Sequence, residues 1–210
     1  MSIIPRLAHS LRRRDELPNQ ELAQEIAAVD NVTAIQELVI GLEHEVKDIQ
    51  HDCIKVLYEV GRIKPSMIAA YLAEFLALLK SANNRMQWGA MCAIDSLTPA
   101  YTGKIYRALP QIIAAADTGS VITRDHAVSI LVRIGTVKKY AADAFELLIA
   151  QLRTCPVNQL PMYAERAISI TTSGNRTRFV DALRLRLPEI ESTAKRKRVE
   201  LVIKKVAPAE

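Results

Sequence analysis

A repeat of 37 residues runs through the middle of the chain and constrains its fold more than any other feature. The recurring residues are small or apolar. They include one series of Cys53, Ala90, Ala127 and Ala164 and another of Leu57, Ile94, Leu131 and Ile168. Within each copy the recurring positions stand at places 0, 4, 7, 8 and 11. That spacing lies on one face of an α-helix, so each copy is predicted to contain a helix with one buried face.

A second apolar series precedes each of these helices and repeats with the same period. Its members are Leu38, Phe75, Ile112 and Ile149. Short polar stretches such as 81–84 separate the two series, so each copy is predicted to be a hairpin of two helices. Asp48, Asn84 and Thr123 are expected to cap the second helices, because each offers a side-chain oxygen to free backbone amides.

One helical hairpin cannot bury its apolar face alone, so successive copies are expected to stack. The predicted repeats cover residues 32–63, 65–98, 102–136, 138–174 and 176–206, giving 10–12 helices and no strands. Residues 17–210 are predicted to form one domain. Its first helix, with Leu22, Ile26 and Val29 on one face, is expected to cap the N-terminal end. Residues 1–16 lack a strong period and are predicted to be mobile.

The second helix of the third copy carries a recognisable motif. Residues 123–135 read TRDHAVSILVRIG, which resembles the HEAT-repeat signature of a β-branched residue, an arginine, an alanine three residues on and a final Ile-Gly. The resemblance extends over residues 32–174 and more weakly over 175–206. It implies an armadillo-like α-solenoid, a right-handed superhelix of about five hairpins. It also implies that the second helices line a concave surface that binds a partner.

The positions opposite the buried face supply the candidate binding residues. Trp88 is the only tryptophan, and the repeat places it away from the core on the same surface as Tyr58. An aromatic strip of this kind suits recognition of a peptide or a flat ligand. The candidates are Trp88, Tyr58, His51, Lys55, Asp95, Arg124, Met162 and Arg166. The alternative is that Trp88 fills a gap beside Gly89 or packs under the N-terminal segment.

The sequence offers little support for catalysis. Asp95 stands seven residues after Trp88, and a carboxylate beside an aromatic on such a surface resembles the alkylpurine DNA glycosylases built from HEAT-like repeats. Those enzymes need a basic groove, whereas the expected concave set is close to neutral. Asp95 is expected instead to pair with Arg133 or Arg62. The four histidines lack metal spacing, and no Gly-rich phosphate loop or nucleophile motif occurs. No enzyme activity, metal or cofactor is predicted.

Charge is distributed unevenly along the chain. Residues 1–105 carry 11 basic and 13 acidic side chains, whereas residues 106–210 carry 17 and 10. Nucleic-acid binding through the last repeat is therefore the alternative function. Its candidates are Arg176, Arg178, Arg184, Arg186, Lys195, Arg196, Lys197 and Arg198. Against this, Val199, Val202 and Val206 share one helical face, so the final helix is expected to cap the solenoid with its basic residues in solvent.

The remaining composition favours a protein of the reducing cytoplasm. Cys53, Cys92 and Cys155 are too few and too scattered for a disulfide framework and are expected in the core. No signal-peptide pattern precedes residues 12–14, and no apolar run is long enough to cross a bilayer. The predicted function is a protein-binding or scaffolding module without membrane association. Its expected partner is another protein or a peptide, and its expected state is a monomer or weak dimer.

Overall fold

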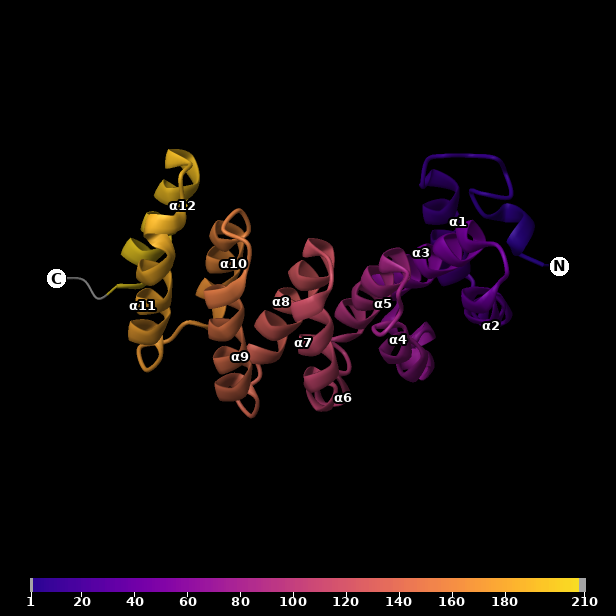
Figure 1. Ribbon diagram of the computed structural model, residues 1–210. Coiled ribbons are helices and arrows are strands. Elements are labelled where there is room, and N and C mark those ends of the chain that lie inside the picture. The colour runs from indigo at the N-terminus through magenta and orange to yellow at the C-terminus, as the bar shows by residue number, and fades with distance from the viewer. Residues whose placement is uncertain (1, 208–210) are drawn as a thin grey trace. The chain divides into compact units, whose positions relative to one another are not determined.

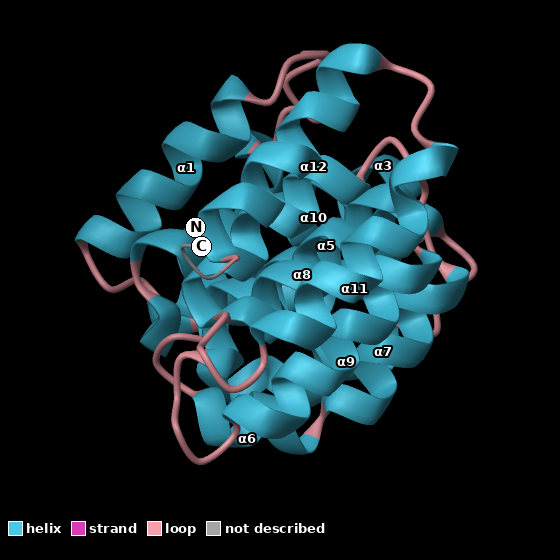
Figure 2. Ribbon diagram, turned by 90° about the vertical axis from the view of Figure 1, so that its left-hand side faces the viewer, coloured by secondary structure: helices cyan, strands magenta, loops and turns pink. Residues whose placement is uncertain are grey.

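The computed structural model describes residues 2–207, and in these residues all regular structure is helical (Figure 2). They form twelve α-helices and six short 3-10 helices, so the predicted all-α solenoid class is confirmed. Met1 and residues 208–210, which the predicted ranges included, lie outside the described residues. The chain forms two compact units, Met1–Ala127 and Val128–Glu210, each of which is considered by itself.

The first unit is built on α3. Its α-helices are α1 Leu17–Ala28, α2 Val32–Ile40, α3 Lys47–Ile63, α4 Leu72–Leu78, α5 Asn84–Leu97, α6 Thr102–Arg107, α7 Leu109–Thr118 and the start of α8 Val121–Gly135. Its 3-10 helices are η1 Ile4–Arg6, η2 Gly41–Glu43, η3 Pro65–Met67 and η4 Ala69–Tyr71. Helix α3 packs against both α1 and α5, while α2 pairs with α3 and α4 pairs with α5 (Figure 1). The second helices of two hairpins, α3 and α5, thus lie side by side, and each packs against the first helix of its own hairpin, α2 or α4.

The second unit contains the end of α8 and two further hairpins. Its elements are α9 Ala141–Thr154, α10 Leu160–Ala167, η5 Ile168–Ile170, α11 Arg176–Arg186, η6 Leu187–Glu189 and α12 Thr193–Val206. Helix α9 contacts α10 and α11, and α12 contacts both α10 and α11. The buried Val199 and Val202 form the inner face of α12. The final helix therefore packs against both α10 and α11.

The core follows the repeat. Every residue at the five recurring positions is buried in α3, α5 and α8. In the fourth copy Leu160, Ala164 and Ala167 are buried, but Ile168 is partly exposed because α10 ends at Ala167 and continues as a 3-10 turn. The three cysteines are buried and free, and burial raises the pKa of Cys53 to about 12. That is the behaviour of core thiols.

The predicted helix caps are wrong by one to three positions. Helix α3 begins after Val46, which makes no side-chain capping bond. In α5 the cap is Asn83 rather than Asn84, and its side chain accepts a hydrogen bond from the amide of Arg85 at 3.1 Å. Ser120 accepts from the amide of Thr123 at the start of α8. Polar residues a few positions apart offer similar side-chain oxygens, so the sequence alone did not distinguish the capping residue from its neighbours.

The N-terminal segment is held by buried polar contacts. The amide of Ala8 donates to Oδ1 of Asn19 on α1 at 3.0 Å, and the amide of His9 donates to Oδ2 of Asp52 on α3 at 2.7 Å. Asn19 and Asp52 are themselves joined by a hydrogen bond of 2.7 Å, and both are buried. Leu7 is fully buried beside them. This part of the segment predicted to be mobile is thus packed on α1 and α3.

Within residues 2–207, no helix combines the length and the apolar composition needed to cross a membrane.

Close packing of α3 and α5 yields a first prediction. A Cβ atom at Gly89 would stand 2.8 Å from Cγ1 of Ile54, closer than carbon atoms pack. We expect Gly89→Leu to lower the free energy of unfolding by about 1–3 kcal/mol, because overpacking forces side chains and backbone to shift. Chemical denaturation measures the change. Gly174→Leu is the control, since the nearest atom there is 3.9 Å away, and an equal loss in both variants would contradict the packing argument.

Candidate functional site

Five side chains of α3 and α5 form the candidate site, named here the aromatic–cation strip. They are Lys55, Tyr58 and Arg62 of α3 with Arg85 and Trp88 of α5. The rings of Tyr58 and Trp88 have centroids 6.1 Å apart and are tilted by 52°. Lys55 and Arg62 each place their charge 4.9 Å from the Tyr58 ring, and Arg85 lies 5.6 Å from the Trp88 ring. These distances are within the range of cation–π attraction.

The members of the strip differ in exposure. Trp88 is half-buried and presents part of its indole to solvent, whereas Tyr58 is only 3% exposed and Lys55 only 4%. Tyr58 and Lys55 therefore lie beneath the surface that Trp88 and Arg85 present. The position of Trp88 agrees with the expectation that it is not part of the hairpin core. The solvent-exposed members of the strip are thus Trp88, Arg85 and Arg62, with Tyr58 and Lys55 buried beneath them.

Two glutamates keep the buried lysine charged. The Nζ atom of Lys55 lies 2.6 Å from Glu16 and 2.8 Å from Glu59. Burial alone would lower the pKa of Lys55, but hydrogen bonds to these carboxylates outweigh it and the pKa is raised. In return, the hydrogen bond from Lys55 lowers the pKa of Glu16. Glu16 also pairs with Arg85 at 3.2 Å, so it joins the two helices of the strip.

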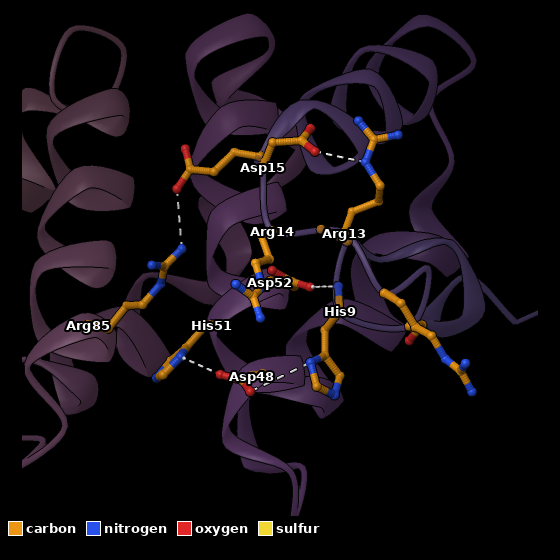
Figure 3. A pocket seen from close by; sticks show the side chains of 12 residues that line it. His9, Arg13, Arg14, Asp15, Asp48, His51, Asp52 and Arg85 are labelled. Atoms are coloured by element: carbon orange, nitrogen blue, oxygen red, sulfur yellow. Dashed lines mark hydrogen bonds and ion pairs between the residues drawn. The ribbon is translucent and has the colours of Figure 1, made fainter.

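A pocket of about 750 Å³ opens beside the strip (Figure 3). Its lining consists of Ala8, His9, Ser10, Arg12, Arg13, Arg14, Asp15, Glu16, Asp48, His51, Asp52 and Arg85. The N-terminal segment forms one wall, and α3 and α5 form the other. Arg85 belongs to both features, and Glu16 of the lining pairs with Lys55 and Arg85 of the strip, so the pocket and the strip are continuous.

The charges of the pocket are largely compensated. Asp48 lies 3.6 Å from Nδ1 of His9 and 3.5 Å from Nδ1 of His51, as Figure 3 shows. Arg13 pairs with Asp15 at 2.8 Å. Four arginines face four carboxylates in the lining, so the pocket holds no surplus of fixed charge. It is therefore an extension of the strip rather than a strong anion site.

Asp95 has a partner that the sequence did not indicate. Its Oδ2 atom lies 2.8 Å from Nδ1 of His126, at the start of α8. Arg62, one of its two expected partners, instead bonds Glu59 at 3.0 Å. Asp95 is buried and tied to the next helix, so the contact joins consecutive repeats of the first unit. Among residues 2–207, no three His, Cys, Asp or Glu side chains gather closely enough to hold a metal ion.

The other candidates lie apart from the strip. His51 lines the pocket, and its Nε2 atom lies 2.9 Å from Nδ2 of Asn83. Arg124 turns to the end of α7, where its Nε donates to the carbonyl of Ala116 at 3.1 Å. In the second unit Met162 is half-buried, and Nη1 of Arg166 donates to Ser129 at 2.9 Å.

The sequence analysis missed three residues of the site: Glu16, Glu59 and Arg85. Glu59 was detectable, because it stands four residues after Lys55 on the same helix, where opposite charges meet. Arg85 was also detectable, because it stands three residues before Trp88 on α5, where a cation can reach the aromatic ring on the same helix face. Glu16 gave no signal, since it precedes the first repeat.

Most of the basic candidates in the second unit are engaged within it. Arg178 forms a two-point ion pair with Glu146. Arg198 forms another with Glu165, with both distances 2.7 Å, and this arginine lowers the pKa of Glu165. Lys195 donates to Asn158, and Arg196 donates to the carbonyl of Ile190.

Arg186 is the most deeply placed of these basic residues. It is 7% exposed, and its guanidinium donates to the carbonyls of Leu152 and Cys155 at 2.8 and 3.0 Å. Those carbonyls belong to the last turn and the C-cap of α9, where the carbonyl groups have no amide partner within the helix. Arg186 is therefore a structural residue that ties α11 to α9. Arg184 and Lys197 are exposed, and Arg176 is partly exposed.

Comparison with known proteins identifies the fold alone. No sequence model of a protein family matches the chain, and no curated protein matches it. Solved structures do match. A computationally designed armadillo repeat protein for modular peptide recognition is 14% identical, with a TM-score of 0.66 over 90% of this chain and 92% of that one.

A second designed armadillo repeat protein, in complex with the peptide (KR)4, is 14% identical, with a TM-score of 0.65 over 98% of this chain and all of that one. An engineered protein is 19% identical, with a TM-score of 0.61 over 98% of this chain and 99% of that one. The chain thus has the fold of armadillo- and HEAT-like helical repeats, as its repeat pattern predicted.

The role assigned to Arg186 gives a second prediction. Arg186→Met should lower the free energy of unfolding by about 1–3 kcal/mol, because it removes the guanidinium that donates to the buried carbonyls of Leu152 and Cys155. Arg184→Met is the matched control on the same helix, where the side chain is exposed and the change should stay within about 0.5 kcal/mol. Urea denaturation of the two variants makes the comparison. Equal stability of both would show that Arg186 is not structural.

The lowered pKa of Glu16 gives a third prediction. A carboxyl group whose pKa is depressed by folding stabilises the protein above its ordinary pKa, and this contribution is lost as pH falls through the folded value. Wild type should therefore exceed Glu16→Gln in free energy of unfolding by about 0.5–1 kcal/mol at pH 7. The difference should shrink below pH 4.5, the ordinary value of Glu16, and vanish in stronger acid. A difference that is constant with pH would refute the ion pair.

Proposed function

We propose that the protein binds an extended segment of another protein along the face of α3 and α5, and that it acts as a non-catalytic binding or scaffolding module. One observation carries this proposal. Trp88, the only tryptophan, is partly exposed and lies close to both the ring of Tyr58 and the guanidinium of Arg85. Apart from Ile63 at the end of α3, the other exposed residues of these two helices are polar.

The geometry suits an anchor residue. Tryptophan, tyrosine and arginine dominate the energetics of protein interfaces, because each buries a large area without losing much conformational freedom. The ring of Tyr58 lies 6.1 Å from the indole at a tilt of 52°, and Gly89 beside Trp88 lets α5 approach α3 closely. The indole is thus fixed before a partner arrives, which reduces the entropy lost on binding.

The structural neighbours also support binding of a peptide segment. Two of them are designed armadillo proteins whose descriptions name modular peptide recognition and a bound peptide, (KR)4. Repeats of this kind present a row of second helices as a continuous surface. The candidate contacts in this chain are Trp88, Arg85 and Arg62 in the first unit, with Met162 and Arg166 as a separate candidate surface in the second. Three free cysteines favour a reducing compartment such as the cytoplasm.

A peptide-display selection tests the proposal and gives the fourth prediction. A random library is selected on the wild-type protein, and affinities of enriched peptides are measured by fluorescence anisotropy. Trp88→Ala should weaken binding at least about 30-fold, the loss typical of a hot-spot residue. Leu201→Ala is the matched control, because it removes an exposed apolar side chain of α12 outside every candidate surface, and it should bind as wild type does. Peptides that bind Trp88→Ala as tightly as wild type would refute the anchor.

Nucleic-acid binding through the basic last repeat is the alternative outcome. It would be indicated by binding of duplex DNA or single-stranded RNA whose affinity falls steeply with salt, with a log–log slope of about −0.9 per phosphate contact on duplex DNA. The internal ion pairs of Arg178 and Arg198 disfavour nucleic-acid binding, because those charges are already compensated.

We further propose that the protein is a monomer or a weak dimer.

A further inference from the structure

We propose that Lys55 and Arg85 form a subsite for an acidic side chain of the bound segment, and that Glu16 occupies this subsite in the free protein. The inference rests on the proposed function and adds the chemistry of the partner. The two cations come from neighbouring helices, α3 and α5, and both belong to the aromatic–cation strip. Glu16 comes from a different part of the chain, at the entrance to α1.

The position of Glu16 shows that the subsite accepts a carboxylate. One oxygen lies 2.6 Å from Nζ of Lys55, and the other lies 3.2 Å from Nη2 of Arg85. A single carboxyl group therefore bridges both helices. Its side chain remains 44% exposed, so a carboxylate from solvent can approach the same cations.

The charge of the strip selects for an acid. With Glu16 in place, the three cations Lys55, Arg62 and Arg85 face two carboxylates, Glu16 and Glu59. When Glu16 leaves, the same three cations face Glu59 alone, which Lys55 and Arg62 share. The vacated strip attracts a carboxylate and repels an ammonium group. This preference is opposite to that of the designed neighbour, whose peptide is (KR)4.

Arg85 has hydrogen-bonding capacity that Glu16 does not use. Glu16 contacts its Nη2 atom, while the buried Nε atom has no hydrogen-bond partner among the described residues. A carboxylate that reached both Nε and Nη2 would form the two-point pair that arginine favours. An incoming acidic side chain, free of the constraint of helix α1, can therefore replace the contact of Glu16 with a stronger one.

Glu16 can leave without unfolding its surroundings. Its side chain makes no capping bond to α1, although it stands at the N-cap position. The N-terminal segment is anchored further back, at Ala8 and His9, and α1 is anchored through Asn19. Residues 9–15 between these anchors are exposed, and Arg12 adopts a left-handed backbone conformation with φ of 55°. The connection is thus a surface loop whose rearrangement leaves the core intact.

Three acetylated octapeptides test the subsite and give the fifth prediction. They repeat Glu-Ala, Gln-Ala or Lys-Ala four times, and binding is followed by the fluorescence of Trp88, which needs no label. The Glu-Ala peptide should bind wild type more tightly than the other two. Glu16→Gln should tighten binding of the Glu-Ala peptide about three- to tenfold, because the internal competitor is removed and the competent fraction rises. Glu21→Gln is the matched control, since it removes an exposed carboxylate from α1 outside the strip.

The outcomes separate the two proposals. If the Glu-Ala peptide leaves Trp88 fluorescence unchanged in both wild type and Glu16→Gln, the acidic subsite is wrong. It is equally wrong if the Lys-Ala peptide binds more tightly, or if Glu16→Gln and Glu21→Gln behave alike. In each of these cases the proposed function still stands, provided that display-selected peptides lose binding with Trp88→Ala. Loss of that dependence overturns the proposed function itself.

Discussion

The close approach of α3 and α5 is the contact on which the first unit depends. Gly89 of α5 presents no side chain to Ile54, and Gly61 of α3 presents none to Ser96, so the two helices pack at short range. Larger residues at these positions would separate the helices. Separation would also move Trp88 away from Tyr58 and Lys55 away from Arg85. The geometry of the aromatic–cation strip is therefore a consequence of small side chains in the core.

Lys55 shows how a charge can be held beneath such a surface. Burial of an ammonium group is unfavourable, and it is tolerated only where carboxylates compensate for the lost water. Glu59 supplies one carboxylate from the same helix, and Glu16 supplies another from the N-terminal segment. One of the two partners is thus fixed by the helix, and the other is replaceable. The net charge of the strip therefore depends on whether Glu16 lies against Lys55 and Arg85.

Basic residues have different roles in the two units. In the first unit Arg85 and Arg62 are partly exposed beside aromatic rings, where they can contact a partner. In the second unit Arg186 holds the end of α9, and Arg198 pairs with α10. The net positive charge of the second half of the chain therefore includes arginines with a structural role as well as exposed ones. A count of charges did not distinguish them, because pairing depends on residues that are distant in sequence.

The sequence by itself determined the helical repeat and the buried face of the second helices in the first three copies. These follow from periodicity, since a residue such as Ile94 must face the core wherever its helix lies. The sequence also placed Trp88 outside the core. Only the tertiary structure decided that Tyr58 and Lys55 are covered while Trp88 is not, because their exposure depends on neighbouring helices and on the N-terminal segment. It also decided that Glu16 meets Arg85, since a contact between residues 69 positions apart is set by packing rather than by any local pattern.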